Sequence, residues 1–96
     1  MKGGYVYIMA SKRNGTLYTG ICGDLYTRIP MHRAGRGSEF CKKYNVTRLV
    51  WYEHHSLYVA AIQRETSIKR WNRAWKLALI EKVNPDWDDL FETLHL

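Results

Sequence analysis

Six residues of this chain are of types that could together act on a phosphate ester. They are Tyr7, Tyr18, Gly20, Arg28, His32 and Glu65. An arginine neutralises a phosphoryl group through its planar guanidinium, and a phenol can take a proton from water if a cation lowers its pKa from about 10. A single carboxylate, completed by water and phosphate oxygens, is a common Mg²⁺ site. The set would suffice for metal-assisted phosphodiester hydrolysis.

The two tyrosines are predicted to share one face of a β-hairpin. The residues on both sides of Asn14-Gly15 are rich in β-formers, and this dipeptide favours a two-residue type I′ turn. Such a turn pairs Tyr7 with Cys22, and any connection of even length keeps Tyr7, Tyr18 and Gly20 on the same face. Gly20 either leaves an open floor beside the phenols or admits a neighbouring group into an aromatic core.

Arg28 and His32 are neighbours one turn apart on a predicted helix. Asp24 is a good N-cap for a helix over 25–34, although Pro30 should kink it or remove a hydrogen bond. Residues at i and i+4 lie on the same side of a helix. The pair is therefore either a solvated basic face or a phosphate-binding pair.

Glu65 interrupts the apolar stripe of a second predicted helix, which Ser56 can cap and which runs to about Trp71. The stripe consists of Leu57, Tyr58, Ala61 and Ile68. A carboxylate on a buried face is costly unless it is paired or holds a metal. A salt bridge to Arg28 or to another base would satisfy Glu65, and so would a divalent cation.

The remaining elements complete one α/β (α+β) domain over residues 1–96. We expect a basic polar loop over 35–45, a third strand over 48–53 and a further helix over 73–83, which ends before Pro85. A short last turn over 88–93 follows. The predicted order is β-β-α-β-α-α.

Charge and cysteine content limit the partners and the compartment. All 15 lysines and arginines precede residue 84, whereas four of the nine acids follow it, so the body of the chain is strongly basic. A basic body suits nucleic acid. No apolar run approaches the roughly 20 residues of a membrane helix, and Cys22 and Cys41 have no metal or disulfide spacing. We expect a cytoplasmic protein without a membrane partner.

In these motifs the sequence resembles the GIY-YIG nuclease family, in particular its small stand-alone bacterial members. The first motif corresponds to Tyr5-Val6-Tyr7 and the second to Tyr18-Thr19-Gly20. Residues 24–32 are similar to the family segment that supplies an arginine and often a histidine. Residues 63–70 resemble the stretch with the metal-binding glutamate. The ordered set is specific, although each tripeptide alone is weak.

The resemblance implies a sheet of three antiparallel strands flanked by helices and a one-metal endonuclease. Tyr7 or Tyr18 would help activate water, with Tyr7 preferred as the base. Arg28 would stabilise the phosphate with assistance from His32, and Glu65 would hold Mg²⁺ or Mn²⁺.

A late asparagine is frequent in the family, and Asn84 is the candidate for it here. The sequence departs from the family pattern at Tyr5 and Thr19, which are plausible strand substitutions, and at Pro30, which could alter how Arg28 and His32 are presented. Many family nucleases also carry a separate DNA-binding domain. This chain has no room for one, so affinity must come from its own basic surface or from a protein partner that supplies targeting.

Two basic clusters with nearby aromatic residues are candidates for contacting nucleic acid. Arg36, Lys42 and Lys43 lie in the predicted loop beside Phe40 and Tyr44, and Lys69, Arg70 and Arg73 lie near Trp71 and Trp75. Basic side chains with stackable rings suit phosphates and splayed bases. The two tryptophans share a helix side with Ala78 and are expected in the core.

Two functions remain open from the sequence. The first is a metal-dependent endonuclease acting on DNA rather than RNA, in repair or recombination, either structure-selective or nonspecific. The alternative is a nucleic-acid-binding module that does not cut. A third, weaker interpretation is a protein-interaction module whose basic face meets an acidic partner.

Overall fold

The computed structural model describes residues 3–94, which contain a three-stranded sheet, four α-helices and one 3-10 helix. In chain order the elements are β1 (Gly4–Ala10), β2 (Leu17–Cys22), α1 (Leu25–Arg33), α2 (Glu39–Lys43), β3 (Arg48–His55), α3 (Tyr58–Arg70), α4 (Arg73–Val83) and a 3-10 helix (Leu90–Thr93). The predicted domain spans 1–96, of which residues 1–2 and 95–96 lie outside the described part. Within 3–94, no helix has the length and apolar character to cross a membrane.

The sheet has the order β2-β1-β3, with both pairings antiparallel. This confirms the predicted three-stranded antiparallel sheet, with β1 as its central strand. All residues of β1 except Tyr5 are buried, because helices cover both faces of the strand. A central strand buried on both faces is expected to be apolar at nearly every position, and the sequence of β1 fits this.

The register of the hairpin differs from the prediction. Tyr7 pairs with Gly20, not with Cys22. The strands are joined by the wider loop 11–16 rather than by a two-residue turn, and this moves every partner by two positions. The number of connecting residues remains even, so Tyr7, Tyr18 and Gly20 do share one face of the sheet.

The predicted loop over 35–45 contains an additional helix, α2, so the order is β-β-α-α-β-α-α rather than β-β-α-β-α-α. Ser38 caps α2, because its hydroxyl oxygen accepts a hydrogen bond from the N–H of Cys41 at 3.3 Å. An acid, Glu39, occupies the first turn, and lysines occupy the last turn. These are ordinary helix signals, and the glycines before Ser38 obscured them.

The ends of the other helices follow local capping. Asp24 caps α1 as predicted, through a 2.9 Å hydrogen bond from the N–H of Tyr26, and α1 continues past Pro30 to Arg33. Ser56 does not cap α3. Instead Leu57 occupies the N-cap position of α3 without a side-chain hydrogen bond. The predicted helix over 73–83 is confirmed as α4.

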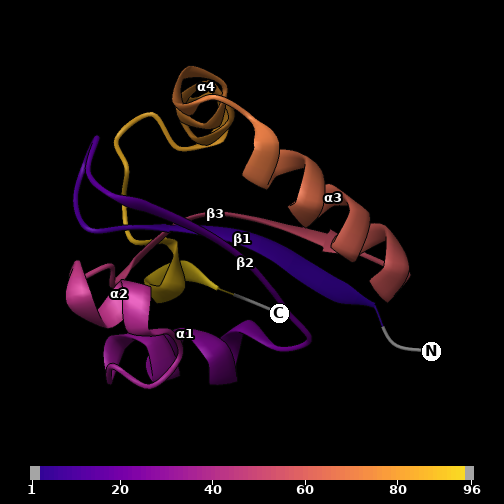
Figure 1. The fold of residues 1–96 in the computed structure, drawn as a ribbon, viewed down its shortest axis with the longest axis horizontal. Helices are drawn as coiled ribbons and strands as arrows, with labels where there is room; N and C mark the ends of the chain where they lie inside the picture. The colour runs from indigo at the N-terminus through magenta and orange to yellow at the C-terminus, as the bar shows by residue number, and fades with distance from the viewer. Residues whose placement is uncertain (1–2, 95–96) are drawn as a thin grey trace.

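The helices form two layers, one on each face of the sheet. Figure 1 shows α3 and α4 on one side, with α1, α2 and the 3-10 helix on the other. The core under α3 and α4 includes Val6, Ile8, Ala10, Ala61, Ile68, Ile80 and Trp87. The core under α1 and α2 includes Tyr7, Met9, Leu25, Ile29, Cys41, Val46 and Leu49. The tyrosine face of the hairpin therefore meets α1.

Candidate active site

The closest polar contact in the candidate site joins β1 to α1. The hydroxyl of Tyr7 lies 2.8 Å from Nε2 of His32, and both side chains are almost completely buried. The ring of Tyr18, from β2, packs beside them, with its centroid 6.4 Å from that of Tyr7 and 5.3 Å from that of His32. We call Tyr7, Tyr18 and His32 the tyrosine–histidine cluster. Three elements thus bring together three of the predicted site residues.

Gly20 makes room for this cluster. A Cβ atom on Gly20 would lie 2.5 Å from Cζ and from the hydroxyl oxygen of Tyr7, and 3.0 Å from a ring carbon of Tyr18. The space beside the glycine is therefore filled by a phenol. Gly20 therefore does not leave an open floor beside the phenols, and the alternative holds that it admits a neighbouring group into an aromatic core.

Arg28 lies against the cluster from the side of α1. Its Nη1 donates to the carbonyl oxygen of Ile21 on β2 at 3.4 Å, and its guanidinium interacts with the phenol of Tyr7. Burial raises the pKa of Tyr7 well above its ordinary value, and Arg28 opposes that rise only in part. Tyr7 is therefore a neutral phenol at physiological pH.

His32 is neutral as well. Burial, and then the positive charge of Arg28, lower the pKa of His32 below its ordinary 6.5. A neutral imidazole can accept the proton of the Tyr7 hydroxyl through Nε2. Its Nδ1 is buried without a hydrogen-bond partner among the described residues, and Gly37 packs against it so closely that a Cβ there would lie 2.6 Å away. No pattern in the sequence indicates this role of Gly37.

Glu65 lies on the other layer of the molecule, on α3. Its carboxylate is 14% exposed and pairs with Nζ of Lys69 at 3.3 Å, so a base other than Arg28 satisfies it. The preceding residue, Arg64, faces β3, since its guanidinium bonds Glu53 at 3.0 Å. Around α3, Arg64 and Glu65 flank the stripe of buried Ala61 and Ile68, so Glu65 lies on the side of α3 that faces away from β3. The sheet thus separates Glu65 from the tyrosine–histidine cluster.

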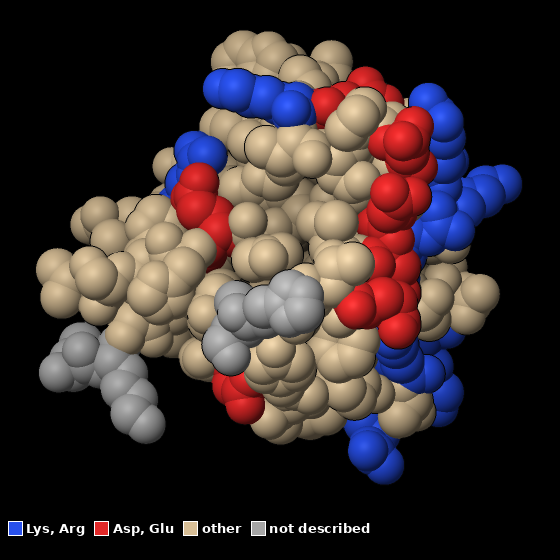
Figure 2. Space-filling view, turned by 180° about the vertical axis from the view of Figure 1, so that it is seen from behind, with Lys and Arg blue, Asp and Glu red and all other residues tan. Residues whose placement is uncertain are grey.

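The basic side chains predicted to contact nucleic acid differ in whether they already bind another group of the protein. Arg36, Lys42, Lys43 and Arg70 are exposed. Lys69 is exposed but paired with Glu65, and Arg73 donates to the carbonyl oxygens of Asn14 and Gly15 at 2.8 and 2.7 Å, which ties α4 to the hairpin loop. Figure 2 shows one face with an uncharged centre, a row of acidic side chains along its right side and lysine and arginine side chains toward its rim, so that face is not a continuous basic surface.

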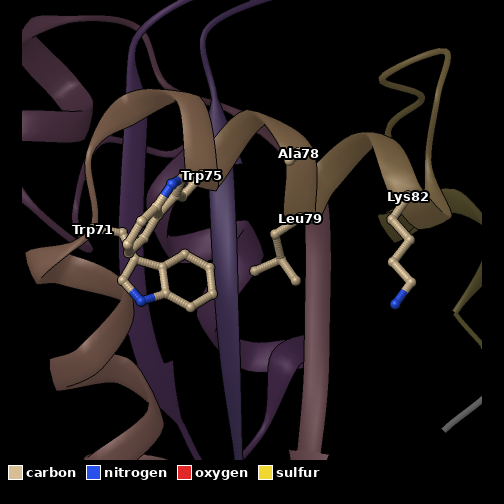
Figure 3. A pocket seen from close by; sticks show the side chains of 5 residues that line it. All are labelled: Trp71, Trp75, Ala78, Leu79 and Lys82. Atoms are coloured by element: carbon tan, nitrogen blue, oxygen red, sulfur yellow. The ribbon is translucent and has the colours of Figure 1, made fainter.

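The tryptophans near α4 are not both in the core, contrary to the prediction. Trp75 is 59% exposed, while Trp71 is half-buried and packs partly against the core. Figure 3 shows the two rings together at one end of a shallow groove, with Leu79 and then Lys82 further along α4. The position of both tryptophans on one side of the helix did not predict their burial, because α4 buries only Ile80 completely.

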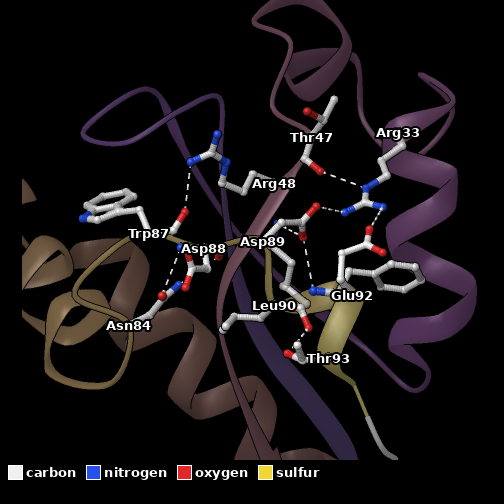
Figure 4. Close-up of polar contacts among 12 residues, drawn as sticks. Arg33, Thr47, Arg48, Asn84, Trp87, Asp88, Asp89, Leu90, Glu92 and Thr93 are labelled. Atoms are coloured by element: carbon white, nitrogen blue, oxygen red, sulfur yellow. Dashed lines mark hydrogen bonds and ion pairs between the residues drawn. The ribbon is translucent and has the colours of Figure 1, made fainter.

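Asn84 is buried at the end of α4 and has a structural role. Its Nδ2 donates to the carbonyl oxygens of Val50 and Asp88, both at 3.0 Å, and its Oδ1 accepts from the N–H of Asp88 at 3.0 Å. Figure 4 shows this network together with the ion pair between Arg33 and Asp89, which fastens the C-terminal segment to α1. The structure does not bring Asn84 to the tyrosine–histidine cluster.

Comparison with known proteins identifies related sequences over most of this chain. Residues 3–78 match the model of the GIY-YIG catalytic domain. A UPF0213 protein of Staphylococcus haemolyticus is 40% identical over 78 residues, which cover 81% of this chain and 94% of that protein. A UPF0213 protein of Staphylococcus aureus is 35% identical over the same share of each chain.

The fold itself has a counterpart among solved structures. The solution NMR structure of a UPF0213 protein from Bacillus halodurans matches 98% of this chain and 99% of that chain, with a TM-score of 0.57 and 24% identity. That likeness concerns the fold, whereas the family model covers most of the chain, including every predicted site residue except Asn84. The chain therefore belongs to the GIY-YIG catalytic domain family.

Proposed function

We propose that this protein is a divalent-metal-dependent endonuclease that hydrolyses phosphodiester bonds in DNA, in repair or recombination. The observation that carries the proposal is the 2.8 Å contact between Tyr7 and the neutral His32, with Arg28 against the same phenol. A buried acid–base pair beside a cation is suited to moving one proton near a phosphate. Membership of the GIY-YIG family supports the same reaction class.

Proton transfer would run from water to Tyr7 and then to His32. Because the pKa of Tyr7 is raised, the phenol does not lose its proton spontaneously, and it needs an acceptor. The attacking water gives a proton to the Tyr7 oxygen as the original phenolic proton passes to Nε2 of His32. Each oxygen keeps its valence, and the proton resides on the imidazole.

Arg28 would control access to this phenol as well as bind the substrate. Tyr7 is fully buried, and the half-buried Arg28 lies against its hydroxyl. When the guanidinium turns to a phosphate, which it can meet through two parallel hydrogen bonds, it uncovers the Tyr7 oxygen. Tyr18 is less buried and would line the same opening.

Glu65 is the proposed ligand of Mg²⁺ or Mn²⁺. Residues 3–94 contain no group of three or more histidines, cysteines and acids placed to hold a metal ion, so the site is one that substrate and water must complete. A lone carboxylate of hard oxygen atoms fits Mg²⁺ in that manner. Its partner Lys69 is 52% exposed and can turn away. When bound, the metal polarises phosphate oxygens and stabilises the leaving group.

A binding module that does not cut is the second candidate. The observation that favours it is the separation of Glu65, paired with Lys69 on α3, from the tyrosine–histidine cluster on the opposite face of the sheet. Such a module would use the basic residues for affinity, and a protein partner could supply targeting or a missing catalytic group.

Cleavage of a labelled panel separates the two candidates. Duplex, single strand, flap, fork and four-way junction are incubated with Mg²⁺, Mn²⁺ or EDTA. Wild type is compared with Glu65→Gln and with Glu53→Gln, another glutamate that is ion-paired and partly buried. A nuclease loses cleavage by orders of magnitude in Glu65→Gln alone and keeps its DNA affinity.

The opposite outcome is equally specific. If wild type cuts nothing, and log affinity falls with log salt by about 0.9 per phosphate contact, the protein is a binding module or requires a partner. Cleavage that survives Glu65→Gln would remove Glu65 from the proposed site.

A further inference from the structure

A row of aromatic rings leads from the tyrosine–histidine cluster to the surface. The ring of Phe40, on α2, has its centroid 6.2 Å from that of Tyr18, and the ring of Tyr44 follows at 4.9 Å from Phe40. We call Tyr18, Phe40 and Tyr44 the aromatic row. It is continuous with the proposed active site, because Tyr18 also contacts His32 at 5.3 Å between centroids.

The outer rings of this row are not needed to bury the core. Phe40 is 43% exposed and Tyr44 is 45% exposed, whereas Cys41 between them is buried and attaches α2 to the core. Two large neighbouring rings at the surface, one helical turn apart, form an apolar patch next to the site.

The surroundings of the patch are basic, which selects the kind of occupant. Lys42 and Lys43 flank the rings, and the ammonium of Lys43 lies 5.3 Å from the centroid of Tyr44. Arg36 is exposed in the loop that precedes α2, and Glu39 is the one acid between residues 35 and 45. Rings set among cations complement a nucleic acid strand, whose bases stack and whose phosphates are negative.

The geometry points to an occupant with unpaired bases. In a duplex the faces of each base are already covered by its neighbours, so exposed rings gain little from it, whereas splayed bases stack readily on aromatic side chains. We infer that Phe40 and Tyr44 form a stacking platform for unpaired nucleotides next to the scissile phosphate. The preferred substrate is then DNA with a single-stranded segment, such as a flap, a fork or an overhang. This inference rests on the proposed nucleic-acid site.

Binding in EDTA tests the platform without cleavage. Fluorescence anisotropy with a labelled oligo-dT strand and with a blunt duplex compares wild type, Phe40→Ala, Tyr44→Ala and Val59→Ala. Val59 is the control, an exposed apolar residue of α3 on the opposite side of the sheet. Loss of one stacked ring should weaken single-strand binding roughly 5- to 150-fold in the first two variants, with duplex binding almost unchanged. Phe40→Leu keeps an apolar side chain and should lose the same affinity.

Several results would overturn the platform. Unchanged single-strand affinity in Phe40→Ala and Tyr44→Ala would do so, as would an equal loss in Val59→Ala or an equal loss for duplex. If sedimentation shows a wild-type dimer that Phe40→Leu dissociates, the row is instead an interface between copies. Wild type that binds the strand through the row but cuts no substrate would refute the nuclease proposal and leave the platform standing.

Discussion

Replacing Gly20 with alanine tests the packing of the tyrosine–histidine cluster. The new methyl group would lie 2.5 Å from the hydroxyl oxygen of Tyr7, a separation that real Cβ contacts essentially never show. Tyr7 is fully buried and cannot simply turn into solvent. Its ring must therefore shift, and its 2.8 Å hydrogen bond to His32 must lengthen or break.

The expected cost has two parts. Overpacking of a well-filled core costs about 1–3 kcal/mol, which for a domain of this size lowers the melting temperature by roughly 4 to 20 °C. A displacement of the Tyr7 hydroxyl approaching 1 Å would slow phosphodiester cleavage by about a hundredfold, because the proposed proton transfer depends on its contact with His32. Catalysis should thus be lost at temperatures where Gly20→Ala is still folded.

Gly23→Ala is the control for this experiment. Among residues 3–94, no atom outside its chain neighbours lies within 4 Å of a Cβ at Gly23, and its backbone is not in the left-handed region. This substitution should be neutral or should stabilise by up to about 1 kcal/mol through the unfolded state. Thermal melts followed by circular dichroism and cleavage of the best substrate give both quantities. Equal melting temperatures and equal cleavage in Gly20→Ala and Gly23→Ala would refute the packing argument.

Two further predictions concern buried polar groups. Asn84→Ala removes three hydrogen bonds and should lower the free energy of unfolding by about 2–4 kcal/mol, yet leave cleavage by the folded protein within about twofold. A large loss of cleavage without a loss of stability would instead place Asn84 in the active site. The lowered pKa of His32 means that the unfolded chain binds its proton more readily. Stability from His32 is therefore present above about pH 6.5 and is lost as the pH falls toward the lowered value. Urea denaturation across that range should show a weaker pH dependence in His32→Gln, and an identical dependence would contradict the assignment of a neutral histidine.

The sequence was sufficient to predict which residues share a face of the hairpin, but not which residues are partners. Side chains alternate along a strand, so any even connection puts Tyr7 and Tyr18 on one side. The partners depend on the length of the turn, and Asn14-Gly15 suggested the shortest one. The loop over 11–16 is wider, so Gly20, not Cys22, lies opposite Tyr7. That difference is the reason why Gly20 accommodates the phenol.

For Glu65, the sequence predicted burial but not the face of the sheet on which the residue lies. Helical periodicity correctly placed it on the inward side of α3, where it is 14% exposed. Periodicity does not say which face of the sheet a helix covers, and the prediction that Glu65 acts together with Tyr7 assumed that its helix covers the face of Tyr7. In the structure α3 covers the other face, and Lys69, one turn further along α3, satisfies the charge. The prediction that Trp75 lies in the core was also wrong. The side of α4 that carries Trp75 is only partly covered by the rest of the protein, so this ring stays exposed.

Arg28 and Glu65 lie in different helix layers, which the sheet separates, and β2 is an edge strand of that sheet. Within the part of the chain that the structure describes, β2 has a neighbouring strand only on the side of β1, so its other side is an edge of the sheet. Arg28 reaches the carbonyl oxygen of Ile21 on this strand from one layer. In the other layer Glu65 lies on the side of α3 away from β3, which in the strand order β2-β1-β3 is the side of β2. In the proposed nuclease, a phosphate that touches both residues must therefore lie across the edge of β2 rather than in a pocket on either face. With the phosphate in that place, the nucleic acid strand next to it would pass Phe40 and Tyr44, because Tyr18 of β2 begins the aromatic row. We expect an edge site of this kind to admit a bent or partly unpaired strand more readily than a straight duplex. Comparing wild type with Phe40→Leu in their affinities for single strand and for duplex tests that expectation.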